Sequence, residues 1–163
     1  MAAPQLSAKK TSSAINTCAN NFFQTMDKSK VYSPLSIGVA MGLVHLGANT
    51  KTDQELSKFF GGKLSLDDLV KLHSYFNSSV AKMSNVLFIN KNLAAINSTY
   101  ISQIQPVALC QSEDFAKQQE VCDIINNFIS TNTNGLIKGV ISPDMITPIV
   151  AAILVNTIYF KCS

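Results

Sequence analysis

The chain has 163 residues, 47% of them hydrophobic and 14% charged, which is enough apolar material for the core of one ordinary domain. Its net charge of +3 comes from lysines that are scattered along the sequence, so the clustered basic stripe of a nucleic-acid-binding protein is missing. We therefore expect a single domain over residues 1–163 and no nucleic-acid partner.

The first residues do not resemble a secretory signal, because such a signal needs an uninterrupted apolar run of about 7–15 residues. The expected compartment is therefore the cytoplasm. The four cysteines are far apart, with no CxxC pair and no histidine at ligand spacing, so we expect free thiols and neither a metal nor a cofactor. They are Cys18, Cys110, Cys122 and Cys162.

The first two predicted elements are helices. Residues 11–27 carry apolar side chains three and four positions apart, which predicts a helix that covers the core with one face. The stretch SPLSIGVAMGLVHLGAN follows and predicts a buried helix, in which Ser33 is the N-cap and Pro34 occupies the first helical position. Gly47 is the expected C-cap. This helix is shorter than the roughly 20 apolar residues that cross a bilayer, so no membrane association is expected.

The buried helix carries two glycines and one histidine. Gly38 and Gly42 lie one turn apart on one face, so we expect another backbone to approach closely there as part of tight core packing. His45 is the one ionisable side chain between Ile37 and Leu46. A histidine on an apolar helix is interpreted as a satisfied core residue rather than a catalyst.

The rest of the chain mixes short helices with apolar runs. Thr52 and Glu55 fit a capping box that opens the next helix, which Gly61 ends. The last run, IVAAILVNTIYF, is apolar on both faces except for Asn156 and Thr157, a pattern typical of a central strand covered on both sides. The predicted helices are 52–60, 65–76, 98–104 and 114–131, and the predicted strands are 83–90, 107–110 and 149–160.

The sequence shows no set of residues for enzymatic chemistry. It has no GxSxG motif and no phosphate-binding loop, and His45 and His73 lie on separate predicted helices. The carboxylates at positions 53, 55, 67 and 68 occupy helix starts, where capping or an interaction with the helix dipole explains them. We therefore expect that the chain is not an enzyme.

Several motifs occur in the order in which one protein family has them. SPLSI with the buried helix, followed by GANTKTDQEL, is similar to helices B and C of the serpins. MSNVLFIN resembles strand 2A of that family, and SEDF with INNFISTNTNGLIKGVI resembles helix F and its outgoing loop. LVNTIYFK resembles strand 3A. The resemblance covers roughly residues 11–161.

The resemblance implies an α+β class, namely the N-terminal portion of the serpin fold, with helices A–F around strands 1A, 2A and 3A of sheet A and the remainder incomplete. Serpins inhibit serine or cysteine proteases as single-use traps, because the protease cleaves an exposed reactive loop that then inserts into sheet A as an extra strand. The implied partner is a serine or cysteine protease. For the family, the extracellular space is the alternative to the cytoplasm.

The resemblance also assigns site residues. Ser33 and Ser36 match the two serines of the family's shutter region, and Asn156 matches the asparagine that hydrogen-bonds to them. Such a network either gates the opening of sheet A or only stabilises the core. The cover formed by helix F and the segment leading to strand 3A would carry Asn126, Thr133 and Gly135.

A full serpin is more than twice as long as this chain, and the absent portion carries the reactive loop. We therefore expect no protease trapping by these 163 residues alone. The alternative is a non-inhibitory, strand-accepting module that self-associates or pairs with another serpin through residues 149–160. Both hypotheses require residues 83–90 and 149–160 to lie side by side.

Overall fold

The computed structural model describes residues 3–25, 32–76, 80–93 and 96–161. Cys162 lies outside the described residues, and Cys18, Cys110 and Cys122 are free thiols. The chain divides into two compact units, residues 1–75 and 76–163, and each is described by itself. No helix in the described part is both long enough and apolar enough to cross a membrane.

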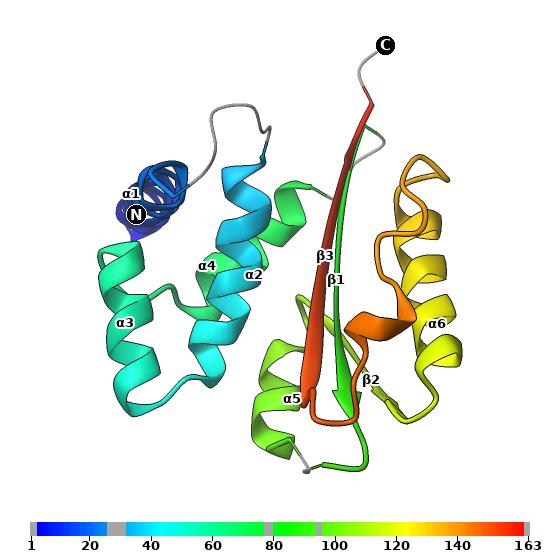
Figure 1. Ribbon diagram of the computed structural model, residues 1–163. Coiled ribbons are helices and arrows are strands. Elements are labelled where there is room, and N and C mark those ends of the chain that lie inside the picture. The colour runs from blue at the N-terminus through cyan, green and yellow to red at the C-terminus, as the bar shows by residue number, and fades with distance from the viewer. Residues whose placement is uncertain (1–2, 26–31, 77–79, 94–95, 162–163) are drawn as a thin grey trace. The chain divides into compact units, whose positions relative to one another are not determined.

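The first unit consists of helices, and α2 contacts each of the other three (Figure 1). Its core is built from side chains such as Cys18, Leu43 and Leu69, which are fully buried. The predicted order of helices is confirmed, although the first helix begins earlier than residue 11. The helices are α1 (Ala3–Phe23), α2 (Pro34–Gly47), α3 (Thr50–Phe60) and α4 (Leu66–Tyr75).

The N-terminus of α2 has the predicted cap. The Ser33 hydroxyl oxygen accepts a hydrogen bond from the Ser36 backbone N–H at 3.3 Å, and Pro34 is the first helical residue. At the other end Gly47 is still helical, and the C-cap is Ala48 in an extended conformation. Gly47 is therefore not the cap, because this helix ends without a left-handed residue.

The two glycines of α2 lie in tight core packing as predicted, although their nearest neighbours are side chains and not another backbone. A Cβ atom added at Gly38 would lie 2.4 Å from Cδ1 of Ile15, and one at Gly42 would lie 2.7 Å from Cδ2 of Leu69. The side chains of Ile15 and Leu69 are buried, at 8% and 0% exposure. The absence of a Cβ thus lets α1 and α4 pack closely on α2.

The capping box lies one helix later than predicted. The start of α3 uses Asn49 as N-cap without a side-chain hydrogen bond, so the box predicted for Thr52 and Glu55 is wrong. Thr52 is already inside the helix, since α3 begins at Thr50, directly after the turn that follows α2. At the start of α4, Ser65 and Asp68 bond reciprocally: the Asp68 backbone N–H donates to the Ser65 hydroxyl, and the Ser65 backbone N–H donates to the Asp68 carboxylate.

Replacing Asp68 with alanine is expected to destabilise the first unit by about 1–3 kcal/mol. The carboxylate, 8% exposed, accepts from the Ser65 backbone N–H at 3.0 Å, the Ser65 hydroxyl at 2.6 Å and the Thr11 hydroxyl of α1. Urea unfolding of Asp68→Ala measures the loss. The exposed Asp67→Ala, one residue earlier in the same helix turn, is the matched control, and an equal loss in both variants would contradict this account.

The second unit is a three-stranded sheet with helices. Strand β1 is the middle strand, parallel to β2 and antiparallel to β3, in the order β2-β1-β3. The predicted neighbours 83–90 and 149–160 therefore lie side by side. The elements are β1 (Ala81–Asn90), α5 (Ser98–Ile104), β2 (Leu109–Glu113), α6 (Gln118–Asn132), the 3-10 helix η1 (Pro143–Met145) and β3 (Ala152–Phe160).

The strand predicted for residues 149–160 differs from β3 in its start. Within the described residues β3 pairs with β1 alone, so its other edge is open here, and its place as a central strand stays a prediction. The strand begins three residues later than predicted, at Ala152, because a turn in which Val150 N bonds to Thr147 O precedes it. Within the described residues, β3 is thus an apolar strand with one unpaired edge.

Helix α6 packs against the sheet formed by β1 and β3 (Figure 1). Phe88 of β1 is fully buried and meets Phe128 of α6 edge to face, with ring centroids 6.3 Å apart. The cluster also contains Val86, Phe115, Val121, Cys122, Ile125, Ile129, Ile146 and Val155. One face of the sheet is therefore covered by α6 and the segment that follows it.

Candidate functional site: the β1–β3 sheet and its cover

The backbone groups of β3 point alternately toward β1 and away from it. Asn90 N bonds to Ala151 O at 2.9 Å, and Lys161 N bonds to Val80 O at 2.7 Å. Antiparallel pairing alternates, so every second residue between these two bonds faces β1. The N–H groups of Leu154 and Ile158 consequently point to the opposite edge, where no described strand lies.

Two asparagines join β3 to β1, its neighbour in the sheet. Asn156 of β3 lies opposite Asn85 of β1, and its side-chain amide donates to Oδ1 of Asn85. Asn85 is only 3% exposed, and its own Nδ2 donates to the backbone carbonyl of Val107, just before β2, at 3.0 Å. The result is a chain of hydrogen bonds that links β3 to β1 and to the segment that leads into β2.

Asn85 is a residue that the sequence analysis missed. Its signal was visible, since it is a polar residue directly before the apolar run VLFI in the predicted strand MSNVLFIN. A buried amide has to find partners, and here its register opposite Asn156 supplies one of them. The predicted network assigned Asn156 to Ser33 and Ser36, which belong to the first unit, whereas Asn156 belongs to the second. That network stays a prediction.

The three predicted cover residues all hold the segment that leaves α6. Oδ1 of Asn126 accepts from the N–H groups of Val140 and Ile141 at 2.9 and 3.0 Å, and its Nδ2 donates to the Ile141 carbonyl at 2.8 Å. The Thr133 hydroxyl donates to the Ile129 carbonyl at 2.8 Å. Gly135 has φ of +75°, a left-handed conformation that ends the helix turn at little steric cost.

Asn126→Ala is expected to release residues 140 and 141 from α6 and to cost about 1–3 kcal/mol, since three hydrogen bonds lose their partner. The exposed neighbour Asn127→Ala is the control, with a change within about 0.5 kcal/mol. Amide hydrogen exchange at Val140 and Ile141 is the measurement. Unchanged protection at these two amides in Asn126→Ala would contradict the assignment of Asn126 as the residue that fixes this segment.

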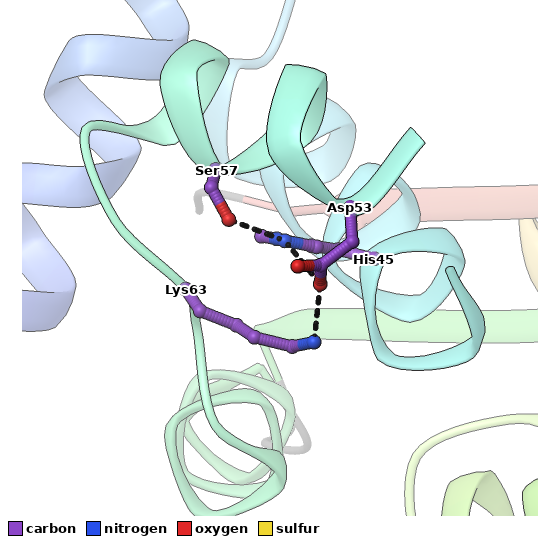
Figure 2. Close-up of polar contacts among 4 residues, drawn as sticks. All are labelled: His45, Asp53, Ser57 and Lys63. Atoms are coloured by element: carbon purple, nitrogen blue, oxygen red, sulfur yellow. Dashed lines mark hydrogen bonds and ion pairs between the residues drawn. The ribbon is translucent and has the colours of Figure 1, made fainter. Parts of the chain in front are cut away.

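A second polar cluster lies in the first unit and joins α2 to α3 (Figure 2). Nε2 of His45 is 3.1 Å from the Ser57 hydroxyl and 3.4 Å from Oδ1 of Asp53, and the same Asp53 oxygen accepts from Lys63. The ring of His45 is fully buried and stacks on Phe60, with centroids 5.8 Å apart. His45 is thus a core residue as predicted, but its Nδ1 is buried without a partner, so the residue is not fully satisfied.

The cluster brings together a serine, a histidine and an aspartate, a contact that sequence reasoning did not anticipate. A hydrolytic triad has the carboxylate on Nδ1 of the histidine and the serine on Nε2. Here Ser57 and Asp53 share Nε2, and the imidazole of His45 has no exposed surface. This geometry does not activate Ser57 as a nucleophile.

His45 and Asp53 both have a pKa that the cluster shifts. Burial, and next the nearby Lys63 ammonium, lower the pKa of His45 below its usual value, and Asp53 acts in the opposite direction. The hydrogen bond from Lys63 lowers the pKa of Asp53. His45 is therefore neutral at pH 7, with Asp53 and Lys63 as the charged pair. Among the described residues no group of three or more His, Cys, Asp or Glu side chains is placed to hold a metal ion.

Comparison with solved structures places this fold among known ones. A cleaved Serpin 42Da superposes with a TM-score of 0.84 over 95% of this chain and 45% of that chain, at 21% identity. Native protease nexin-1, solved with heparin, superposes with a TM-score of 0.80 over 94% of this chain and 46% of that chain, at 22% identity. At these identities the likeness shows the fold alone.

Sequence comparison gives the family. An uncharacterized serpin-like protein of Acanthamoeba polyphaga mimivirus is 37% identical over 156 residues, 94% of this chain and 39% of that protein. Antithrombin-III of Mus musculus is 33% identical over 172 residues, 92% of this chain and 37% of that protein. The chain thus spans well under half the length of these relatives. The family model for serpins (serine protease inhibitors) matches residues 13–163, and the chain belongs to the serpin family.

Proposed function

We propose that this chain supplies the strand-accepting half of a serpin-type serine protease inhibitor. The observation that carries the proposal is the open edge of β3, a strand of nine residues that pairs with β1 alone within the described residues. In a longer chain with a reactive loop, that sheet would take up the cleaved loop as an additional strand. The proposed partner is a serine or cysteine protease, which would cleave that reactive loop.

The chemistry of β3 supports strand addition. An apolar edge strand with backbone groups directed outward is a template for another chain, and natural proteins usually block it with charges, prolines or bulges. Between Ala152 and Phe160 the strand has none of these. Main-chain hydrogen bonds to an added strand would supply the affinity, and the alternating side chains would supply the specificity.

We propose that the hydrogen-bonded asparagines and the cover of α6 control this opening. Asn156 and Asn85 join β3 to β1 by a hydrogen bond. The family resemblance implies that Ser33 and Ser36 belong to the shutter together with Asn156. Asn126, Thr133 and Gly135 fix the segment after α6, which has to move if the sheet is to expand. The known contacts of each residue are compatible with a gating role and with a role in stability alone.

The resemblance to serpins implies a further strand of sheet A, strand 5A, in the portion of the family that this chain does not cover. The proposal is tested with a synthetic peptide that has the sequence of this strand in mouse antithrombin-III. Titrating it into the 163-residue chain is expected to raise the melting temperature, since a ligand that binds the folded state stabilises it. A scrambled peptide of the same composition is the first control. No rise with the strand peptide would count against strand acceptance.

Leu154→Pro provides a matched control within the chain. The N–H of Leu154 faces the open edge, so proline there removes a donor for the added strand and leaves the ladder to β1 intact. The variant is expected to melt close to the unmodified chain and to lose the response to the peptide. An undiminished response would show that the peptide binds elsewhere.

A second function, a module that pairs with another copy of itself, uses the same edge. Two β3 strands could pair antiparallel about a two-fold axis, because an edge strand is self-complementary in its backbone. Analytical ultracentrifugation of the unmodified chain and of Leu154→Pro distinguishes this case: a dimer that Leu154→Pro abolishes supports self-association.

For protease trapping, we expect the 163 residues alone to form no SDS-resistant complex with a serine protease, and such a complex would overturn this part of the proposal.

A further inference from the structure

We propose that His45, Asp53, Ser57 and Lys63 form a pH-sensitive latch that holds α3 and the turn after it against α2, closed at neutral pH and progressively weakened as the pH falls. The latch is independent of strand acceptance by β3. It joins three consecutive pieces of the first unit, because His45 belongs to α2, Asp53 and Ser57 to α3, and Lys63 to the turn that follows α3.

The contacts fix the form of the imidazole. Nε2 of His45 lies beside an ionised carboxylate, which can only accept hydrogen bonds, so the proton of the neutral ring belongs on Nε2 (Figure 2). Nδ1 then carries a lone pair. This lone pair is buried without a donor, which is tolerable for a neutral ring.

Protonation changes this balance. A second proton would go to Nδ1 and create a buried N–H donor with no acceptor, on a ring that has no exposed surface. It would also place a positive charge beside the ammonium of Lys63, and Asp53 offsets only part of the cost because it is already paired with that lysine. The charged ring is therefore more stable outside the cluster, in water.

Two charged side chains shift the pKa of the His45 imidazole, Lys63 and Asp53. Asp53 contributes from α3 and Lys63 from the turn, and within the described residues neither α1 nor α4 contributes a charge that shifts the pKa of His45. The folded pKa is lowered relative to the unfolded value of 6.5. An opened form thus binds the proton more readily, and closure of the latch is favoured less and less as the pH falls through 6.5 toward the folded pKa.

Release would affect a cavity next to the latch. Phe60, on which the ring stacks, and Lys63 both line a cavity of about 350 Å³, which Lys10 and Ala14 of α1 also line. When His45 leaves its site, Phe60 loses its stacking partner, whereas Asp53 and Lys63 keep their ion pair.

Native-state amide hydrogen exchange of the 163-residue chain between pH 7.5 and 5 tests the latch, with rates corrected for the intrinsic pH dependence. The opening equilibrium of α3 amides is expected to increase by up to about tenfold per pH unit below pH 6.5, the limit for one proton. His45→Gln keeps an N–H donor, does not titrate and should give a flat profile. An opening equilibrium of the unmodified chain that does not change with pH would overturn the proposal.

The other histidine supplies the matched control. His73 of α4 is the second of the two histidines in the chain, so His73→Gln removes one titrating imidazole and leaves the cluster intact. It should keep the pH dependence of the unmodified chain. If His73→Gln abolished the pH dependence, or His45→Gln retained it, the assignment to His45 would be wrong.

Lys63→Met tests the electrostatics even if His45→Gln does not fold. The Lys63 side chain is 49% exposed, so its replacement leaves the core packing unchanged. Without the ammonium, Asp53 acts fully on the imidazole, and the NMR titration midpoint of His45 is expected to rise, which weakens the pH response of α3. An unchanged or lower midpoint would contradict the latch.

Discussion

Phe88→Ala is expected to destabilise the second unit by about 3–5 kcal/mol, the range for removing a fully buried aromatic ring. Phe88 is 0% exposed and lies between β1 and α6, in edge-to-face contact with Phe128. Its removal leaves a cavity at the point where the cover meets the sheet. Urea unfolding followed by circular dichroism measures the loss.

Phe160→Ala is the matched control for this substitution. Phe160 is also in the sheet, at the end of β3, but is 67% exposed, so its truncation is expected to change the free energy of unfolding by less than about 0.5 kcal/mol. Amide exchange in α6 should also become faster in Phe88→Ala alone. Equal losses in the two variants would mean that α6 is not anchored through Phe88.

Asn85→Ala is expected to lower the free energy of unfolding by about 2–4 kcal/mol, because the Val107 carbonyl loses its donor and Asn156 loses its hydrogen bond to Asn85. Asn156→Ala should cost less, about 1–2 kcal/mol, since Asn85 keeps its bond to Val107. The double variant should be less unstable than the sum of the two, with a coupling of about 0.5–3 kcal/mol.

The double-mutant cycle separates a network from two independent residues. Asn127→Ala, an exposed asparagine of α6, repeats the chemical change without a buried partner and is expected to be neutral. If the losses at Asn85 and Asn156 add without coupling, the hydrogen bond between them does not stabilise the sheet. The gating role of Asn156 would then lose its structural basis.

The sequence predicted best where a local signal and the packing agree. The cap of α2 by Ser33 and the strand β1 follow from the residues alone, because a serine before a proline and an apolar run between polar residues each favour one structure. It failed where two local signals compete. Thr52 and Glu55 match a capping box, yet the short turn after α2 already starts α3 at Thr50.

The candidate site was only partly predictable because its contacts are distant in the sequence. The family resemblance assigned Asn126, Thr133 and Gly135 to the cover, and they lie on α6 and the segment that leaves it, while their role in gating stays a prediction. The pairing of Asn85 with Asn156 depends on the register of two strands that are 71 residues apart. The partners of His45 depend on how α3 folds back on α2, and the apolar pattern of these helices does not fix this rotation.

The most direct test of strand acceptance is amide hydrogen exchange at Leu154 and Ile158, whose N–H groups face the open edge of β3. With the strand 5A peptide of mouse antithrombin-III bound, both amides should become protected, whereas Val155 and Thr157, which already face β1, should change little. Protection that stays the same at Leu154 and Ile158 in saturating peptide would contradict the claim that β3 accepts a strand.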